Sequence, residues 1–186
     1  MGKKAVSLGA EDWVEAANEA LASGGVDAVR VEPLAEGLGV TKGSFYWHFA
    51  DRGALLDAVL TSWERRATAA IIELVDARHE TPRARLKGLL DVTQMPAAGA
   101  RIEHAIRVWG ARDAAIQRRL AKIDVTRERY VRELLVASGL EKTLAETRAR
   151  ILYLVLIGEF TWVSHGGAAS NAAFREELFT LVTAKR

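Results

Sequence analysis

The chain has 186 residues, of which 49% are hydrophobic and 27% are charged, and its formal net charge is +2. This length fits one or two domains with a substantial core, and this composition excludes a disordered chain. The sequence contains no cysteine, which excludes disulfides and thiolate metal sites and suits a reducing compartment.

The N-terminal third predicts three short helices. The first has one apolar stripe, at the spacing of a single helical face. That stripe consists of Trp13, Ala17, Ala20 and Leu21. Ser23-Gly24-Gly25 ends this helix, because glycine closes helices in a left-handed conformation. The second helix is "PLAEGL" at 33–38, with Pro33 in its first turn and Gly39 after its end. We expect the Thr41 hydroxyl to cap the third helix.

The rest of the chain predicts longer helices. A fourth begins after an Asp51 cap and runs to about Ala77. Thr81-Pro82 begins a fifth that Pro96 ends, and four more follow at 102–109, 116–135, about 141–165 and 174–182. No stretch predicts a strand. We therefore predict an all-α protein of about nine helices, divided near the fourth helix into domains of residues 1–54 and 55–186.

Residues 40–49, "VTKGSFYWHF", concentrate aromatic side chains. At about 100° per residue, Phe45 and Phe49 fall on one side of a helix and Trp47 on the other. We expect the two phenylalanines to anchor this helix in the core while Tyr46, Trp47 and His48 face outward. A large exposed aromatic surface is costly in water unless it has a partner. Periodicity alone leaves open that Tyr46 and Trp47 instead complete a core.

An outward face of this composition suits DNA. Hydroxyl, imidazole and ammonium groups reach phosphate oxygens, and Gly43 permits a close approach of the backbone. A helix that follows a three-residue turn and is anchored from behind has the geometry that enters a major groove. Residues 1–53 carry a net charge of −3, so the placement of their cations must matter more than their sum.

The stretch "VEPLAEGLGVTKGSFYWHFADRGALLDAV" resembles the helix-turn-helix signature of the TetR family of bacterial transcription regulators. The Leu-Gly-Val turn, the Tyr-x-His-Phe ending and the basic residue before Leu-Leu all stand at family spacing. The resemblance covers roughly residues 10–60; beyond it, only the number and layout of helices are similar. It implies a DNA-binding domain at 1–54, with a reading helix at about 42–48, and a ligand-binding and dimerisation domain at 55–186.

The resemblance also implies which residues meet double-stranded DNA. Positions that approach base edges are matched by Lys42, Gly43 and Ser44. Positions that contact the backbone and the groove are matched by Thr41, Tyr46, Trp47 and His48. Arg52 matches the basic residue at the start of the fourth helix, where its guanidinium should grip a phosphate.

Two residues depart from the family pattern. Val31 and Glu32 stand where many members have polar or basic groups. With the negative charge of this region, they predict a modest affinity that depends strongly on the few cations present. Lys42→Ala and Arg52→Ala are each expected to weaken DNA binding and to flatten its salt dependence.

Family members are homodimers, typically joined through their last two helices. Here the last two helices carry more apolar residues than one stripe needs. The expected dimer interface consists of Leu152, Leu156, Phe160, Phe174, Leu178 and Leu181. The alternative is that these residues only line the core of a monomer.

The C-terminal domain, by the same resemblance, binds an effector. An apolar helical pocket with a few polar groups would accept a small hydrophobic or aromatic molecule. The candidate pocket residues are Trp63, Met95, His104, Trp109, Tyr130, Tyr153, Glu159 and Trp162. Each of these residues, taken alone, is more often part of the core or the surface than of a ligand site. Binding is expected to shift the fourth helix, change the spacing of the two reading heads and release DNA.

The expected function is that of a homodimeric repressor that a small molecule releases from a palindromic operator. The alternatives are an activator, a regulator that binds DNA without an effector, and a helical small-molecule-binding protein. We do not expect an enzyme, a cofactor or a metal, because "HETPR" at 79–83 has Arg83 where a zinc motif needs its second histidine, and no nucleophile or nucleotide motif occurs.

No segment predicts export or membrane insertion. The apolar stretch after Lys3 and Lys4 is too short for a signal peptide. The longest apolar run, "ILYLVLIG" at 151–158, is far shorter than the about 20 residues of a membrane span. We expect a soluble, cytoplasmic protein in which Lys3 and Lys4 form either a basic arm on DNA or a solvated tail.

Overall fold

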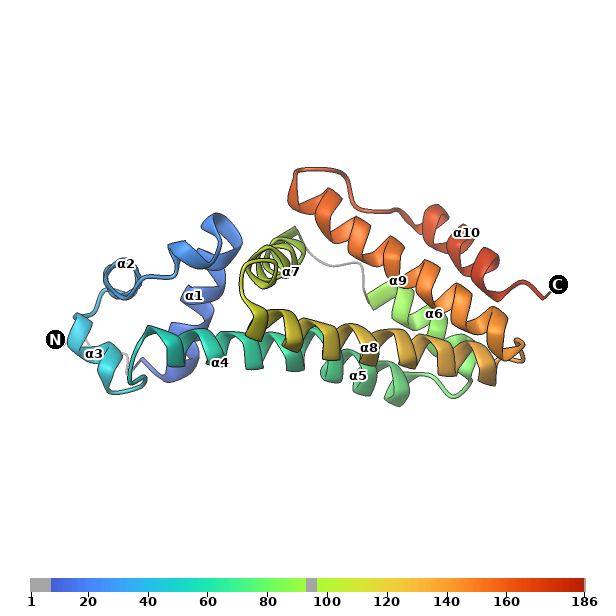
Figure 1. Ribbon diagram of the computed structural model, residues 1–186, viewed down its shortest axis with the longest axis horizontal. Helices are drawn as coiled ribbons and strands as arrows, with labels where there is room; N and C mark the ends of the chain where they lie inside the picture. The colour runs from blue at the N-terminus through green and yellow to red at the C-terminus, as the bar shows by residue number, and fades with distance from the viewer. Residues whose placement is uncertain (1–7, 93–96, 186) are drawn as a thin grey trace, which may run out of the picture. The chain divides into compact units, whose positions relative to one another are not determined.

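The computed structural model describes residues 8–92 and 97–185, and all regular structure in those ranges is helical (Figure 1). The predicted basic arm (Lys3 and Lys4), the candidate pocket residue Met95 and the helix end predicted at Pro96 lie outside these ranges. The chain forms two compact units that meet in the sequence between Trp63 and Glu64.

The N-terminal unit consists of helices that surround a small apolar core. It contains α1 (Ala10–Gly24), the 3₁₀ turn η1 (Val26–Ala28), α2 (Val31–Gly37), α3 (Lys42–Tyr46) and α4 (Arg52–Glu64), of which α4 ends at the boundary between the units. Its core residues without solvent exposure are Trp13, Ala17, Leu21, Val29, Phe45, Leu55 and Val59. Three of the four residues predicted for the stripe of the first helix therefore face a core, and the fourth, Ala20, is half-buried.

The fourth predicted helix is continuous over residues 52–78, as expected, but it contains one irregular turn. After α4, the π-helical turn η2 (Arg65–Ala69) leads directly into α5 (Ala70–Arg78). Such a turn shifts the backbone hydrogen bonds from i+4 to i+5 and is frequent at functional sites. If 52–78 is taken as one helix, the described chain has the nine helices that the sequence predicted.

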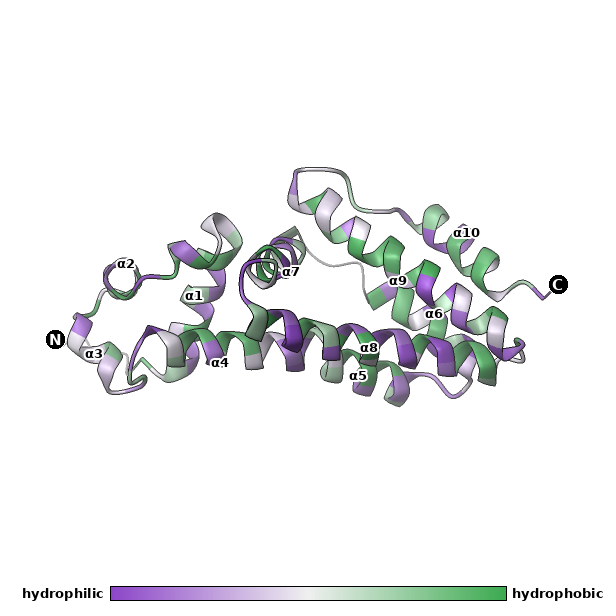
Figure 2. Cartoon of the chain, viewed as in Figure 1, coloured by the Kyte–Doolittle hydropathy of each residue, from purple (hydrophilic) through white to green (hydrophobic). Residues whose placement is uncertain are grey.

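The C-terminal unit is a bundle of long helices. It contains η2, α5, α6 (Pro82–Val92), α7 (Ala97–Gly110), α8 (Ala114–Ala137), α9 (Lys142–Ser164) and α10 (Ala172–Thr183). Helix α9 packs against both α7 and α8, and α10 packs against α6 and α9. Hydrophobic residues run along much of α9 and α10 (Figure 2). No helix in the described ranges is both long enough and apolar enough to cross a bilayer.

Several helix ends follow the predicted signals, but α2 begins at Val31, two residues before the predicted start at Pro33. Gly25, Gly139 and Gly166 have positive φ at helix C-termini, and the Asp51 carboxylate accepts a hydrogen bond from Ala54 N at 2.8 Å. The Thr41 hydroxyl, however, makes no cap bond to α3. Its backbone is extended and its carbonyl oxygen accepts from Ser44 N at 3.0 Å instead, so the main chain starts this helix.

Candidate functional site

Helix α3 follows a tight turn that glycine makes possible. Leu38 N and Val40 N donate to the carbonyl oxygens of Leu34 and Ala35, each at 2.9 Å, which closes α2. Between them Gly39 has φ +69°, a conformation that side chains with a Cβ rarely adopt. The turn holds α3 at a fixed angle to α2, and these two helices pack against each other.

The aromatic residues of α3 divide as the sequence predicted. Phe45 has no solvent exposure and packs edge-on against Trp13, with ring centroids 5.2 Å apart. Phe49 is 8% exposed and stacks on Phe45 at 5.6 Å. In contrast, Tyr46 is 55% exposed and Trp47 is 88% exposed. The alternative in which Tyr46 and Trp47 complete a core is therefore wrong.

The remaining predicted DNA contacts on α3 surround this exposed aromatic surface. Thr41, Lys42, Gly43 and His48 are exposed, and Ser44 is half-buried. A Cβ placed on Gly43 would have its nearest neighbour, Thr41 Oγ1, at 3.5 Å, which is ordinary contact. Packing within the protein thus does not require glycine at position 43. We refer below to the outer side of residues 41–48 as the α3 face.

An acidic residue reaches the α3 face from α2. Glu32, which departs from the family pattern, accepts a hydrogen bond from Lys42 Nζ in an ion pair whose side chains are both at least half exposed. The hydrogen bond from Lys42 lowers the pKa of the Glu32 carboxyl, and the same bond raises the pKa of Lys42. The other departure, Val31, is 8% exposed and belongs to the core, which explains its apolar character.

Arg52 has a different environment from the one that the sequence implied. Its Nε donates to Val29 O and its Nη2 donates to Val26 O. These bonds tie the start of α4 to the segment between α1 and α2. Since part of the guanidinium is used in holding the N-terminal unit together, fewer of its donors remain for a phosphate. Sequence position alone did not reveal this internal role.

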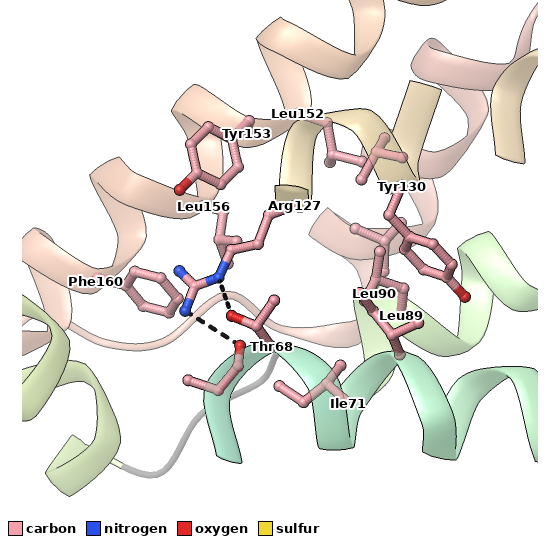
Figure 3. A pocket seen from close by; sticks show the side chains of 13 residues that line it. Thr68, Ile71, Leu89, Leu90, Arg127, Tyr130, Leu152, Tyr153, Leu156 and Phe160 are labelled. Carbon is pink, nitrogen blue, oxygen red and sulfur yellow. Dashed lines mark hydrogen bonds between the residues drawn. The ribbon is translucent and has the colours of Figure 1, made fainter. Parts of the chain in front are cut away.

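The C-terminal unit contains a small apolar pocket, partly open to solvent, with a cavity volume of about 70 Å³ (Figure 3). Helices α5, α6, α8 and α9 and the π turn η2 all contribute to its wall. The lining residues are Ala67, Thr68, Ile71, Ile72, Leu89, Leu90, Arg127, Tyr130, Val131, Leu152, Tyr153, Leu156 and Phe160. Most are hydrophobic, which suits an apolar ligand.

A buried ion pair borders the pocket. The Arg127 guanidinium donates from Nη1 to Glu103 Oε1 at 3.0 Å and from Nη2 to Glu103 Oε2 at 3.3 Å. Glu103 has no solvent exposure. Arg127 also donates to Thr68 Oγ1 at 3.0 Å and to Ala67 O at 3.1 Å, the two bonds drawn in Figure 3. The π turn thus supplies a hydroxyl and a carbonyl oxygen to this arginine.

A second arginine extends the network to α9. Arg107 donates to Glu103 Oε1 at 3.0 Å and, through Nη1 and Nη2, to both oxygens of Asp124 at 3.2 and 2.8 Å. The Tyr153 hydroxyl donates to Asp124 and accepts from Arg107. Burial tends to raise the pKa of Asp124, but the hydrogen bonds from Arg107 and Tyr153 outweigh it and lower that pKa. Burial and the bond to Asp124 raise the pKa of Tyr153.

Of the predicted pocket residues, only Tyr130 and Tyr153 line this pocket. Trp63 is buried in the N-terminal unit, and Trp162 is 65% exposed. Their predicted role in the pocket is therefore wrong, since neither faces it.

The other three predicted residues in the described ranges lie elsewhere. His104 packs edge-on against His165, with ring centroids 4.9 Å apart, and burial followed by the charge of His165 lowers its pKa. Trp109 is half-buried outside the pocket wall. Glu159 borders a smaller neighbouring pocket and accepts from Ser170 N at 2.7 Å, so it holds the segment that precedes α10.

Sequence reasoning missed the ionised residues of this site, although a signal was present. Arg127 lies on the apolar stripe of α8, in register with Leu120, Ile123, Val131 and Leu134. Glu103 stands likewise on the stripe of α7. A charged residue at a core position of an amphipathic helix implies a buried partner of opposite charge. Two such residues of opposite charge on two helices are therefore expected to pair with each other.

The last two helices keep an exposed apolar surface within one protomer. Its members on α9 and α10 are Ile151, Leu154, Trp162, Phe174 and Leu181. Only Phe174 and Leu181 of these were predicted. Leu152 and Phe160, also predicted, are 5% and 4% exposed and face the protomer's own core, while Leu156 and Leu178 are half-buried against it. On α9, each exposed residue lies one or two positions along the sequence from a residue that was predicted for the interface.

The fold and the site define a class: an all-α protein with an N-terminal helix-turn-helix unit and a C-terminal helical unit that contains an apolar pocket. The family model described as bacterial regulatory proteins of the tetR family matches residues 14–59. This confirms the resemblance predicted from the sequence: residues 14–59, which lie within α1 to α4, are similar to the N-terminal domain of TetR-family regulators.

Solved structures extend the likeness of fold to nearly the whole chain. A transcriptional regulator from Rhodococcus sp. RHA1 is 19% identical with a TM-score of 0.76, over 95% of this chain and 94% of that one. A TetR-like transcriptional regulator from the same organism is 17% identical with a TM-score of 0.72, over 98% and 96%. The ketosteroid transcriptional regulator KstR2 of Mycobacterium tuberculosis is 18% identical with a TM-score of 0.64, over 94% and 92%. Comparison with curated proteins found no significant match.

Proposed function

We propose that the protein is a sequence-specific DNA-binding repressor that acts as a homodimer and leaves its operator when a small apolar molecule binds. The observation that carries this proposal is the α3 face. It presents an 88% exposed indole, an exposed phenol and an ammonium group on a helix that Phe45 fixes in the core. Such a surface is costly in water and well suited to a groove of DNA.

The α3 face offers groups for both kinds of DNA contact. Lys42 and Ser44 donate hydrogen bonds that can read base edges, and Thr41, Tyr46 and His48 can reach phosphate oxygens. Gly43 is free of packing demands within the protein, so the absence of a side chain there is explained by a close approach of the backbone to DNA. Arg52 contributes mainly by holding the start of α4.

Homodimer formation is supported by the exposed apolar residues of α9 and α10. Several large apolar side chains exposed on two neighbouring helices are typical of a protein–protein interface. A twofold interface joins the same patch of both subunits, and it would cover Leu154 and Leu181, which are 60% and 59% exposed. Two subunits related in this way would read a site with twofold symmetry.

Release by an effector is supported by the pocket and by the helix that borders it. Ala67 and Thr68 of η2 belong to the continuous helix 52–78 whose first residue, Arg52, is bonded to the N-terminal unit. A ligand that favours one position of this helix would shift the population between two dimer geometries. KstR2, whose fold is similar, is a ketosteroid transcriptional regulator, which agrees with an apolar effector.

Selection from a random pool of double-stranded DNA with the purified protein tests this proposal. We expect enrichment of a roughly palindromic site, and a reporter gene that carries the site should then be expressed less when the protein is present. The matched control is the double variant Tyr46→Ala/Trp47→Ala, which removes only exposed side chains and should fold normally without enriching any site. No enrichment by the wild-type protein would contradict DNA recognition and favour a small-molecule-binding protein. Increased reporter expression would indicate an activator.

A further inference from the structure

We infer that the pocket in the C-terminal unit takes an uncharged, mostly apolar molecule and discriminates against carboxylates and ammonium ions of the same size. This inference rests on the proposed function, in which the pocket holds the effector. It adds the charge class of that effector, which follows from the bonds that the polar side chains of the wall already make.

The cation in the pocket wall already has a counter-ion. Arg127 is only 10% exposed, and its guanidinium forms two hydrogen bonds with the fully buried Glu103 carboxylate. Its Nε is bonded to Thr68, and Nη2 also to Ala67 O. A carboxylate ligand that formed a two-bond ion pair with Arg127 would have to displace Glu103. That displacement would leave a buried carboxylate without its partner, which costs more than the new contact returns.

The two tyrosines of the wall have no proton to offer a ligand anion. A phenol has a single O–H donor. Tyr153 donates it to Asp124, and Tyr130 donates it to Asp76 Oδ1 at 2.7 Å. Neither Asp76 nor Asp124 lines the pocket. Both tyrosine hydroxyls are therefore bonded to carboxylates that lie outside the pocket wall. The hydroxyls thus serve the protein's own network and present their rings to the cavity.

An ammonium ion would find no better partner. Arg127 is the ionised residue among those that line the pocket, and it carries the same charge as an ammonium ion. The rings of Tyr153 and Phe160 could attract a cation, but the nearby carboxylates of Glu103 and Asp124 are already bonded to two arginines. Two acidic and two basic groups leave the cluster without net charge. A charged ligand of either sign would lose its hydration without gaining a free counter-charge.

The hydrophobic residues of the wall can bind an uncharged molecule without disturbing this network. Ile71, Leu89 and Leu156 come from three different helices and face the same space (Figure 3). Burial of apolar surface against them is favourable whatever polar group the ligand carries. The bonded cluster around Arg127 then acts as one rigid side of the pocket.

Matched probes test the inference on the wild-type protein. Phenylalkyl and n-alkyl scaffolds of several lengths are each prepared as a primary amide, a carboxylate and a primary amine, and their affinities are measured by calorimetry near pH 7. We expect the amide of each scaffold that binds to bind at least about tenfold more tightly than its two charged analogues, because of the desolvation of a buried charge. Equal or tighter binding of a carboxylate or an amine would overturn the inference and leave the effector proposal intact.

Two variants locate the binding and test its cause. Ile71→Trp fills the pocket from a half-buried position and should abolish amide binding, whereas Leu74→Trp, on the exposed side of α5, should not. Glu103→Gln removes the counter-ion of Arg127 and should raise carboxylate affinity relative to that of the amide by about tenfold or more. If Glu103→Gln does not fold, the comparison of amide, carboxylate and amine probes on the wild-type protein remains the test of the inference. Amide binding that persists in Ile71→Trp overturns the inference, and failure of every probe overturns the effector proposal with it.

Discussion

Glu32 and Lys42 form an ion pair on the surface that we propose meets DNA. The pair has no net charge, so Glu32 offsets the one lysine of the α3 face. An acidic group at this place repels phosphates and must give up or share its lysine when DNA binds. Glu32 therefore restrains binding to any DNA, and base contacts at the correct site must compensate for that restraint.

We predict that Glu32→Gln tightens binding to random-sequence DNA more than binding to the selected site. The variant adds one effective positive charge, so the slope of log K against log salt should become steeper by about one. Fluorescence anisotropy at several salt concentrations measures both quantities. Glu36→Gln, an exposed change on the same helix, is the control and should have a smaller effect. Equal effects of the two variants would show that only net charge matters, and not the pair with Lys42.

Arg52 shows that the position of a residue in a family pattern does not by itself determine what its side chain binds. Its guanidinium donates to Val26 O and Val29 O, and both partners are backbone atoms that any sequence would supply. No residue pattern could therefore have indicated these bonds. The exposed rings of α3 were predictable, in contrast, because helical geometry alone sets Trp47 opposite Phe45 and Phe49.

We predict that Arg52→Ala lowers the unfolding free energy of the protein by about 1.5–3 kcal/mol, the usual cost of losing hydrogen bonds from a charged donor. Urea unfolding followed by circular dichroism measures this change. Arg30→Ala removes an exposed arginine from the same unit and should change the unfolding free energy by less than about 0.5 kcal/mol. Similar values for the two variants would mean that the bonds of Arg52 do not stabilise the unit.

At the scale of helices, the sequence predicted which segments are helical more reliably than which side of each is buried. Composition and capping signals indicated all nine helices, because these signals are local. Helix α9 is apolar nearly all round at Leu152 to Ile157, so its period did not select one face. Packing against α7 and α8 makes that choice, which is why Leu152 and Phe160 are buried while Leu154 is exposed.

The buried network holds α7, α8, α9 and η2 together, and Glu103 is its centre. We predict that Glu103→Ala destabilises the protein by about 3–5 kcal/mol, because Arg127 and Arg107 both lose a buried carboxylate partner. Thermal or urea unfolding checks this value. The control is Glu133→Ala, whose side chain is 64% exposed in a pair with Arg129 on α8 and should cost less than about 0.5 kcal/mol. A small loss for Glu103→Ala would contradict a structural role for the network.

At the scale of the whole molecule, the proposed activity needs two copies of the chain. We predict that Leu154→Arg gives a monomer at micromolar concentration, because an unpaired charge buried in an apolar interface is costly. Analytical ultracentrifugation measures the state. Val125→Arg, at a residue of α8 that is similarly exposed, should remain dimeric. A wild-type monomer, or a Leu154→Arg dimer, would contradict the proposed interface.

If the α3 face binds DNA, the loss of Lys42 must change both the affinity for DNA and its dependence on salt. Removal of Lys42 leaves Glu32 unpaired on this face, so the pair changes from no net charge to a negative charge. Binding to the selected site, followed by fluorescence anisotropy between low and moderate salt, should weaken, and the slope of log K against log salt should decrease in magnitude by about one. An unchanged affinity and slope in a folded Lys42→Ala protein would show that the α3 face does not bind DNA.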